Sequence, residues 1–189
     1  MAVLAGTTKA FSGREVARLS GVSVNGAWKA LQRLAEHGLV NEEPAGGKTT
    51  LYTLNRDHLA AEAIVTLIRL RSILVSRITE QMESWTIQPA HASLFGSAAR
   101  GDGDTTSDVD IFIVRPKGVD EEDTRWRSQL DELADAVRSW TGNHAGISEI
   151  PESELARLRR ERPQVIQDVE RDGITLFGEP ASTLLRRRR

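Results

Sequence analysis

The stretch that decides the fold runs from Gly96 to Asp110, GSAARGDGDTTSDVD, and leads directly into the apolar run Ile111 to Val114. Glycine and aspartate are ordinary turn residues, so their presence alone would indicate only a loop before a strand. The spacing says more, because Asp108 and Asp110 are two residues apart and alternate residues of a strand point to the same side. Two carboxylates held side by side repel each other unless a cation lies between them. We therefore predict that they bind a divalent metal, and Mg²⁺ is the natural choice because it takes oxygen ligands and shares them with substrate phosphates.

Strands are expected on both sides of this polar stretch. The run 92–95 (ASLF) is a predicted strand that ends at Gly96 and Ser97, and 109–114 (VDIFIV) is the next strand. A glycine lets the backbone come close to a ligand, and a serine hydroxyl with exposed amide groups suits the phosphates of that ligand. The sequence therefore predicts a phosphate-binding turn that faces the two carboxylates.

The order Gly-Ser, small residues, Arg-Gly and then Ser-Asp-x-Asp resembles the nucleotidyltransferase signature of the DNA polymerase beta superfamily, in its minimal bacterial form. The resemblance implies that Asp108 and Asp110 are catalytic residues that bind Mg²⁺, and that the reaction is nucleotidyl transfer from a nucleoside triphosphate. The residues that it implies for nucleotide binding are Gly96, Ser97, Arg100 and Ser107. Two interpretations of Arg100 stay open, because it could contact phosphate oxygens or form an ion pair with Asp102 or Asp104.

Active members of this superfamily carry a third carboxylate on a later strand, here expected over 144–150. The matching position falls near Gly146, where the sequence has no acid. Glu149 is the nearest carboxylate and the candidate third catalytic residue, and His144 is a possible substitute base. Glu149 could equally be an ordinary residue at the end of a strand. A helix is predicted over 121–141, two short helices over 152–170 with a break at Pro163, and a closing strand after 172.

The N-terminal third has a different pattern. Residues 12–20 form a predicted helix that ends at Gly21, and a second helix begins at Ser23, with apolar residues at helical spacing. These apolar residues are Val24, Ala27, Trp28, Leu31, Leu34 and Ala35. Gly38 closes the second helix, and a hairpin follows over 39–54.

The region from 11 to 55 resembles a winged helix-turn-helix of bacterial regulators, which implies that the second helix binds a major groove of double-stranded DNA and that the hairpin is the wing. The first 57 residues also hold seven basic and five acidic residues, in a chain with a net charge of −2. The residues expected to contact DNA are Ser23, Asn25, Gly26, Lys29, Arg33, Lys48 and Thr49. The alternative is a helix pair that mediates protein contacts, with Lys29 and Arg33 simply solvated.

The segment from His58 to Trp85 has few helix breakers and is predicted to be one long helix. Its apolar content exceeds what one buried stripe needs, so it would pack against both domains or against a second copy of the chain. We therefore expect a homodimer, as is common for proteins that bind paired DNA half-sites.

Composition sets further limits. The chain has 189 residues, 39% of them hydrophobic, and no cysteine, which excludes disulfides, thiolate metal sites and cysteine nucleophiles. The apolar runs are too short to cross a membrane, and the first residues lack a signal-peptide pattern, so we expect a cytoplasmic protein with no membrane partner. The basic end, Arg186 to Arg189, is either a solvated tail or a contact for nucleic acid.

Together these patterns predict an α+β chain. Residues 1–57 would form the winged helix-turn-helix, 58–88 a linking helix, 89–180 the nucleotidyltransferase-fold domain with a mixed sheet and helices, and 181–189 a basic tail. Two functions fit. The first is a DNA-binding transcriptional regulator whose nucleotidyltransferase-fold domain binds Mg²⁺ and a nucleoside triphosphate. The alternative is an active nucleotidyltransferase with an unknown acceptor, in one version as part of a toxin-antitoxin type system.

Overall fold

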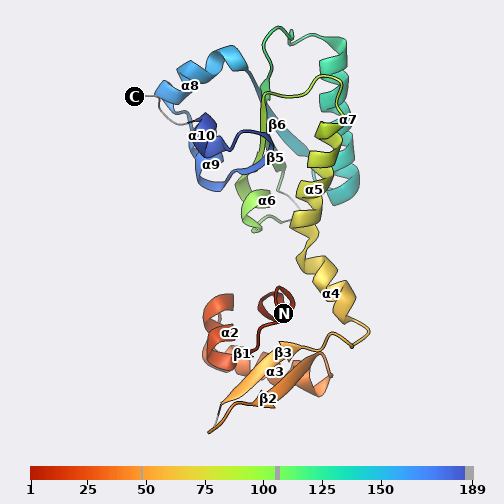
Figure 1. Cartoon of the computed structure of the whole chain (residues 1–189), viewed down its shortest axis with the longest axis vertical. Helices are drawn as coiled ribbons and strands as arrows, with labels where there is room; N and C mark the ends of the chain where they lie inside the picture. The colour runs from red at the N-terminus through yellow and green to blue at the C-terminus, as the bar shows by residue number, and fades with distance from the viewer. Residues whose placement is uncertain (48, 105–106, 186–189) are drawn as a thin grey trace. The chain divides into compact units, whose positions relative to one another are not determined.

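The chain folds into two compact units, Met1–Leu70 and Arg71–Arg189, here called the N-terminal and C-terminal units. The structure is a computed structural model and describes residues 1–47, 49–104 and 107–185 (Figure 1). Each unit has its own hydrophobic core. None of the helices in the described part of the chain is long and apolar enough to cross a bilayer.

The N-terminal unit combines short helices with a small antiparallel sheet of order β1-β3-β2. Its elements are α1 (Ala2–Ala5), β1 (Phe11–Ser12), α2 (Gly13–Ser20), α3 (Val24–Glu36), β2 (Val40–Pro44), β3 (Thr50–Leu54) and α4 (Ala61–Ile68).

Local side chains define the ends of α2 and α3. The N–H of Glu15 donates to Ser12 Oγ at 3.3 Å, and the N–H of Ser12 donates to Glu15 Oε2 at 2.8 Å, which makes a capping box at the start of α2. Gly21, with φ +67°, ends α2 in the left-handed conformation that glycine tolerates best. Ser23 Oγ then accepts the N–H of Gly26 at 3.1 Å and starts α3. The predicted helix, glycine turn and second helix are confirmed.

One part of the apolar series in α3 is not in the core. Ala27 and Leu31 are buried against α2 and the sheet, with 3% and 2% of their surface exposed. Val24 and Trp28 belong to the same series by helical spacing, yet they are 55% and 48% exposed. The core of this small unit therefore uses one side of the stripe and leaves the other side to solvent.

The single long helix predicted from His58 to Trp85 is wrong. The structure has α4 (Ala61–Ile68) and α5 (Leu70–Glu83), separated by Arg69 at φ −90° and ψ 0°. The N–H of Arg69 bonds to the carbonyls of both Val65 and Thr66, so α4 closes in a tight turn. No glycine or proline marks this break, and the sequence therefore gave no signal for it.

The C-terminal unit is built on a mixed sheet of order β6-β5-β4-β7, in which β5 and β6 are parallel and the other neighbours are antiparallel. After α5, its elements are β4 (His91–Phe95), α6 (Gly96–Arg100), β5 (Val109–Arg115), α7 (Thr124–Thr141), β6 (Ala145–Pro151), the 3₁₀ turn η1 (Glu152–Glu154), α8 (Leu155–Glu161), α9 (Gln164–Asp172), β7 (Ile174–Gly178) and α10 (Ala181–Leu184). The mixed sheet with helices agrees with the predicted fold class. The predicted turn at Gly96 and Ser97 is instead the first turn of a short helix.

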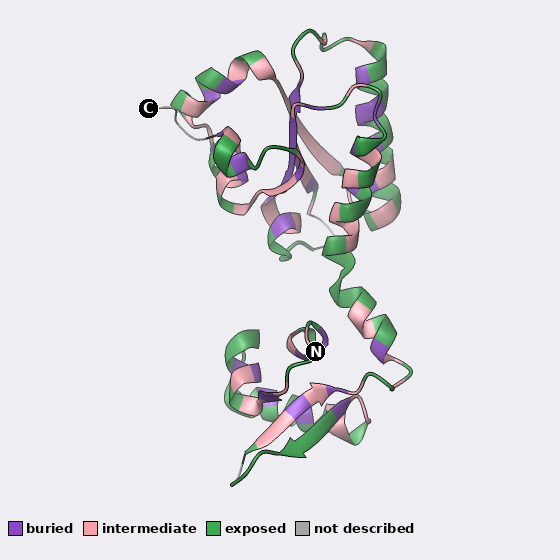
Figure 2. Ribbon diagram, viewed as in Figure 1, coloured by how far each residue is buried: buried purple, intermediate pink, exposed green. Residues whose placement is uncertain are grey.

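Helices cover both faces of this sheet, and β5 alternates between them. Ile111 and Ile113 pack with α5 and α7 in one core, whereas Phe112 and Val114 pack with α8, α9 and α10 in the other. Figure 2 shows the central strands buried between half-exposed helices. Asp110 has the same parity as Phe112, so it belongs to the face covered by α8 and α9.

His91 in β4 makes the stability of this unit pH-dependent. It is fully buried, its Nδ1 lies 2.8 Å from the carbonyl oxygen of Glu179, and its Nε2 lies 2.7 Å from Ser93 Oγ. A carbonyl only accepts, so Nδ1 donates to it, and in the neutral ring, which burial favours, Nε2 accepts from Ser93 Oγ. Burial lowers the pKa of His91.

The stability that the neutral ring contributes is fully present above about pH 6.5, the pKa of a histidine in the unfolded chain. It is lost progressively as the pH falls below that value. We expect the free energy of unfolding to fall between about pH 7 and about pH 5, by up to about 1.4 kcal/mol per pH unit. Urea titrations at several pH values measure this. The double variant His91→Leu, Ser93→Ala should show a smaller pH dependence over that range, and an unchanged dependence would contradict the assignment.

Candidate functional site

The backbone of two neighbouring segments comes close to the side chain of Asp110. It is the second residue of β5, and the register pairs it with Phe95 of β4 on one side and with Gly146 of β6 on the other. Gly96 follows Phe95 at φ +69°, and a Cβ at Gly96 would lie 2.3 Å from Asp110 Oδ2. Only glycine leaves room for this carboxylate.

Asp108 approaches the same point from the segment just before β5. A Cβ at Gly146 would lie 3.1 Å from Asp110 Oδ1 and 3.8 Å from Asp108 Cβ, so both aspartates border Gly146. The side chain of Asp110 is partly buried, whereas Asp108 is exposed. The structure thus brings together Gly96, Asp108 and Asp110, three of the residues singled out in the sequence.

The electrostatics of this point favour a cation. Burial raises the pKa of Asp110, the negative charge of Asp108 raises it further, and Asp168 adds to this, while Arg100 opposes them. A carboxylate that is partly desolvated beside another carboxylate is stabilised by a positive ion. No cluster of three or more histidine or acidic residues arranged to hold a metal occurs among the described residues. Two carboxylates nevertheless fit Mg²⁺, which is commonly held by one or two carboxylates and completes its shell with water and substrate phosphates.

The loop after α6 folds back over Ser97. The carbonyl of Ser97 accepts the N–H of Gly101 at 2.8 Å and the N–H of Asp102 at 3.2 Å. A Cβ at Gly103 would lie 3.2 Å from Ser97 Oγ and 3.6 Å from Ser107 Cβ, so Gly103 lies against both serines. This places Ser97 of α6 close to Ser107 of the following loop.

The hydroxyl of Ser107 is already engaged within this loop. It accepts the N–H of Asp104 at 3.0 Å and donates to Asp104 Oδ1 at 3.0 Å. Ser107 therefore shapes the segment that leads into Asp108, and a direct contact with a nucleotide would require these bonds to exchange.

Arg100 forms ion pairs in the structure. Its Nε lies 3.1 Å from Asp102 Oδ2 and its Nη1 lies 2.7 Å from Asp172 Oδ2. Arg171 and Arg100 lower the pKa of Asp172 to about 2. Of the two interpretations of Arg100, the ion pair with Asp102 is thus the arrangement found, and the added pair with Asp172 connects α6 to the end of α9. Asp172 is 72 residues away in sequence, so nothing local marked it.

Glu149 does not join the two aspartates. It pairs with Ile113 in the register, three residues beyond Gly146, and so lies on the opposite face of β6, under α7. There Trp126 Nε1 donates to Glu149 Oε1 at 2.9 Å, and Arg115 Nε lies 2.8 Å from the same oxygen. The expectation that Glu149 is the third catalytic carboxylate is therefore corrected: it forms a largely buried ion pair with Arg115.

His144 offers no clear replacement for that carboxylate. It is exposed, and its Nδ1 lies 3.4 Å from Arg138 Nη1. The position next to Asp110 on β6 is Gly146, as the sequence suggested.

Asn143 is a residue that sequence reasoning missed. Its Nδ2 donates to the carbonyl of Ser107 at 2.7 Å and to the carbonyl of Asp104 at 3.1 Å. Alongside, the N–H of Val109 donates to the carbonyl of His144 at 2.8 Å. Asn143 therefore ties the turn between α7 and β6 to the segment that ends at Asp108. A Gly-Asn pair after a helix indicated only a turn.

The predicted DNA contacts are in the N-terminal unit and are exposed. Ser23, Asn25, Gly26, Lys29 and Arg33 all lie at the surface of α3 or at its start, and Thr49 lies at the end of the hairpin turn. The hydroxyl of Ser23 is engaged in the helix cap. Lys48 lies outside the described residues, as do Arg186 to Arg189.

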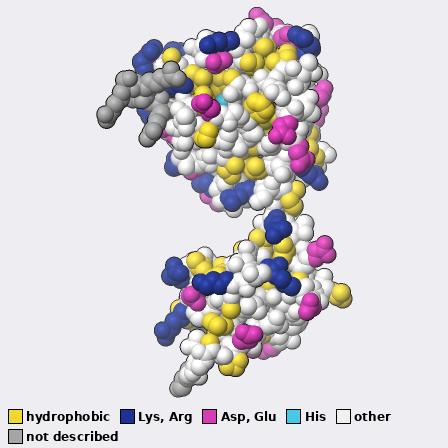
Figure 3. Space-filling view, viewed as in Figure 1, with side chains coloured by type: hydrophobic (Ala, Val, Ile, Leu, Met, Phe, Trp, Pro, Cys, Tyr) yellow, Lys and Arg dark blue, Asp and Glu magenta, His cyan; other side chains and the backbone are white. Residues whose placement is uncertain are grey.

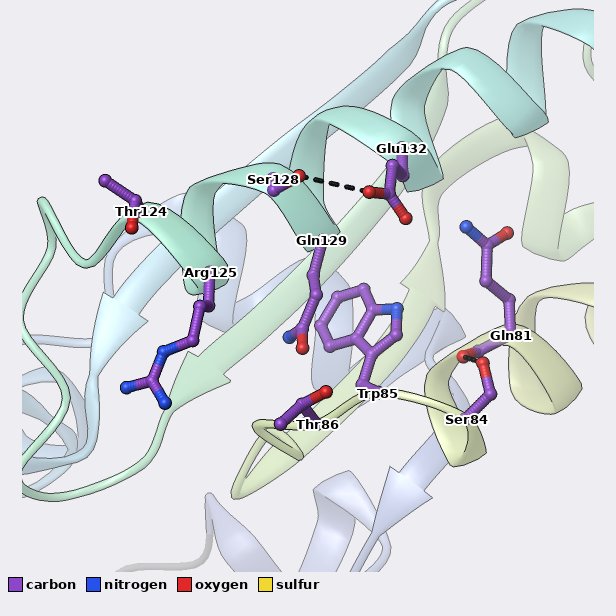
Figure 4. A pocket seen from close by; sticks show the side chains of 9 residues that line it. All are labelled: Gln81, Ser84, Trp85, Thr86, Thr124, Arg125, Ser128, Gln129 and Glu132. Atoms are coloured by element: carbon purple, nitrogen blue, oxygen red, sulfur yellow. Dashed lines mark hydrogen bonds between the residues drawn. The ribbon is translucent and has the colours of Figure 1, made fainter.

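A hollow in the C-terminal unit, away from Asp110, lies between the end of α5 and the start of α7, with a volume of about 450 Å³ (Figure 4). Several of its polar side chains bond to each other or to backbone. Gln129 bonds both the N–H and the carbonyl of Ile87, and Ser128 donates to Glu132 at 3.0 Å. None of its lining residues is one of the predicted site residues.

One family model matches the part of the chain that contains Asp110. The model of the nucleotidyltransferase domain family matches residues 75–174, more than half of the 189 residues. No curated protein matches the chain.

Three solved structures that the chain resembles have low identity and low TM-scores. A mutant MntA-HpeT toxin-antitoxin complex has 18% identity, a TM-score of 0.41, and coverage of 59% of this chain and 80% of that chain. A toxin-antitoxin structure with AMP-PNP has 20% identity, a TM-score of 0.38 and the same coverages. A proposed nucleotidyltransferase from Sulfolobus solfataricus has 24% identity, a TM-score of 0.34, and coverage of 62% and 87%. Through residues 75–174, which include Gly96, Asp108 and Asp110, the chain belongs to the nucleotidyltransferase domain family.

Proposed function

We propose that the C-terminal unit transfers a nucleoside monophosphate from a nucleoside triphosphate to an acceptor oxygen, with Mg²⁺ held by Asp108 and Asp110. The observation that carries this proposal is the Asp110 carboxylate seated against Gly96, with Asp108 beside it at Gly146. The family match favours the transfer hypothesis over the regulator hypothesis, because it covers the unit that would perform the chemistry. A role in a toxin-antitoxin pair stays a prediction.

In the proposed reaction the acceptor oxygen attacks the α-phosphorus, the bond from that phosphorus to the bridging oxygen breaks, and pyrophosphate leaves. When bound, Mg²⁺ would neutralise charge that develops on the phosphates. The carboxylates of Asp108 and Asp110 would bind and orient the metal. Gly96 would let the phosphates approach the backbone, and Ser97 Oγ would donate to a phosphate oxygen.

Other residues would stabilise the site without contacting the reacting atoms. Arg100, bound by Asp102 and Asp172, would hold α6 and its Gly96-Ser97 start against α9. The proposal gives Glu149 no catalytic role, because its carboxylate is paired with Arg115 on the other face of β6.

Calorimetry tests this function. ATP is titrated into the native chain, with and without Mg²⁺, and into the double variant Asp108→Asn, Asp110→Asn. We expect Mg²⁺-dependent binding to the native chain and none to the double variant. Asp131→Asn, on the exposed side of α7, is the control and should bind as the native chain does. Native-like binding by the double variant would exclude this site. Release of pyrophosphate from ATP then measures turnover.

Asn143→Ala is expected to weaken Mg²⁺-dependent ATP binding through Asp108. Two hydrogen bonds to the carbonyls of Asp104 and Ser107 are lost, so the free energy of unfolding should also fall by roughly 1–3 kcal/mol. The test is a double-mutant cycle of binding with Asp108→Asn. If Asn143 acts by positioning Asp108, Asn143→Ala weakens binding in the native chain and has little further effect in the Asp108→Asn chain. An equal loss in both would show that it affects only general stability.

We also propose that the N-terminal unit is a winged helix-turn-helix that binds double-stranded DNA, as a homodimer. What supports this is the succession of α2, a left-handed glycine turn, α3 and the β2-β3 hairpin, together with exposed cations on the two helices. Arg14, Arg18, Lys29 and Arg33 form no ion pair with any described residue. Binding to duplex DNA at increasing salt concentration tests this, because phosphate contacts make affinity fall steeply with salt.

A further inference from the structure

A hollow in the N-terminal unit lies between the starts of α2 and α3 and strand β3, with a volume of about 720 Å³. Its principal lining side chains are Arg14, Val24, Asn25, Trp28, Thr50 and Tyr52. Val24 and Trp28 stand four residues apart and Asn25 and Trp28 three apart, so the three lie together on one side of α3. Val24 and Trp28 give this hollow an apolar part beside the polar side chains of Arg14, Asn25 and Thr50.

The fold gives no reason for the exposure of Trp28. The core of the unit is closed by Ala27 and Leu31, which neighbour Val24 and Trp28 on the same apolar stripe of α3. Trp28 and Val24 nevertheless keep 48% and 55% of their surface in water. Exposure of this much apolar surface to water is unfavourable. A cluster of exposed apolar side chains on a small unit typically marks a surface that binds a partner.

The charges around the hollow indicate which partner. Arg14 lines it, and Arg18, Lys29 and Arg33 are exposed on the same two helices. Figure 3 shows basic side chains gathered over α2. The neighbouring acid, Glu15, is engaged by the N–H and the hydroxyl of Ser12 in the cap of α2. An exposed apolar surface with Arg14 at its edge and further cations on the same two helices complements a DNA major groove, where phosphates border the thymine methyl groups.

We propose that Val24, Asn25 and Trp28 read A·T base pairs in the major groove. The Asn25 amide would bond the N6 and N7 atoms of adenine, and the surface of Val24 and Trp28 would contact the thymine C5-methyl group. This inference rests on the proposed DNA binding and adds to it a base preference and two residues, Val24 and Trp28. Lys29 and the arginines would contact phosphates and contribute affinity without sequence preference.

The thymine methyl group can be tested by itself. The probes are duplexes of equal length with alternating dA-dT, alternating dA-dU, which lacks only the methyl group, and alternating dG-dC. Fluorescence anisotropy of the full chain measures each Kd at one salt concentration. We expect the dA-dT duplex to bind about tenfold more tightly than dG-dC, and measurably more tightly than dA-dU.

Substitutions at Trp28 and Lys29 separate the base contact from the phosphate contact. Trp28→Ala should bind dA-dT and dA-dU equally and keep the native salt dependence. Lys29→Ala should weaken binding to all three duplexes and reduce the salt slope by about one. Val24→Ala, a smaller change on the same surface, should reduce the preference for dA-dT over dA-dU and serves if Trp28→Ala does not fold, as judged by circular dichroism.

Each other outcome is informative. Salt-dependent binding with equal Kd for the three duplexes would overturn the base reading and leave the proposed DNA binding intact. Failure to bind any duplex would overturn both. Tighter binding to a single-stranded dT oligonucleotide of equal length than to the duplexes would also overturn the groove reading, because an exposed tryptophan can stack on unpaired bases.

Discussion

Asp110→Asn should abolish Mg²⁺-dependent ATP binding and reduce nucleotidyl transfer by more than about 100-fold. Loss of a residue that only supports a metal ligand costs up to about 100-fold, and Asp110 is proposed to be a ligand itself. Asparagine keeps the size of the side chain and one oxygen ligand, but it removes the charge that attracts the metal. The same change should stabilise the metal-free fold, because the Asp110 carboxylate is partly buried and repelled by Asp108, which together raise its pKa.

The two effects have opposite signs, which separates a damaged site from a damaged fold. Thermal unfolding with and without Mg²⁺ measures the second effect, and calorimetry with ATP measures the first. We expect Mg²⁺ with ATP to raise the melting temperature of the native chain and to leave that of Asp110→Asn unchanged. A variant that binds ATP normally, or that is simply less stable without metal, would contradict the assigned role.

Gly96→Ala is expected to damage both the fold and the site. Alanine at φ +69° costs roughly 1–3 kcal/mol of backbone strain. Its Cβ would also lie 2.3 Å from Asp110 Oδ2, so the carboxylate must move away or the backbone must shift. We therefore expect loss of Mg²⁺-dependent ATP binding in addition to a lower free energy of unfolding.

Gly118→Ala is the matched control for this variant. Gly118 has φ +82°, and a Cβ there would meet no heavy atom within 4 Å, so only the backbone strain is introduced. Urea unfolding should show a loss for both variants, larger for Gly96→Ala, and calorimetry should show native ATP binding for Gly118→Ala alone. Native ATP binding by Gly96→Ala would mean that the carboxylate does not depend on this close approach.

The sequence was informative where a local pattern marked the element. The spacing of Asp108 and Asp110 before an apolar run placed both carboxylates at the start of a strand, because strand geometry repeats every two residues. Ser12 and Glu15, three residues apart, marked the start of α2 in the same way. The short helix α6 and the break at Arg69 were missed, since neither a short helix after Gly96 nor a tight turn without glycine or proline has a distinct local pattern.

Tertiary structure decided the rest. Whether Glu149 or Gly146 stands beside Asp110 depends on the register of β5 against β6, and a shift of one residue would exchange the two faces of β6. Arg100 meets Asp172 only because α9 packs against α6. Helical spacing put Trp28 in the apolar series, but the core closed on Ala27 and Leu31 and left the indole exposed. By itself the sequence determined the local elements and the pair of aspartates that leads into β5, because backbone periodicity is local. Only the tertiary structure decided which of them meet, because strand register and helix packing join residues that are distant along the chain.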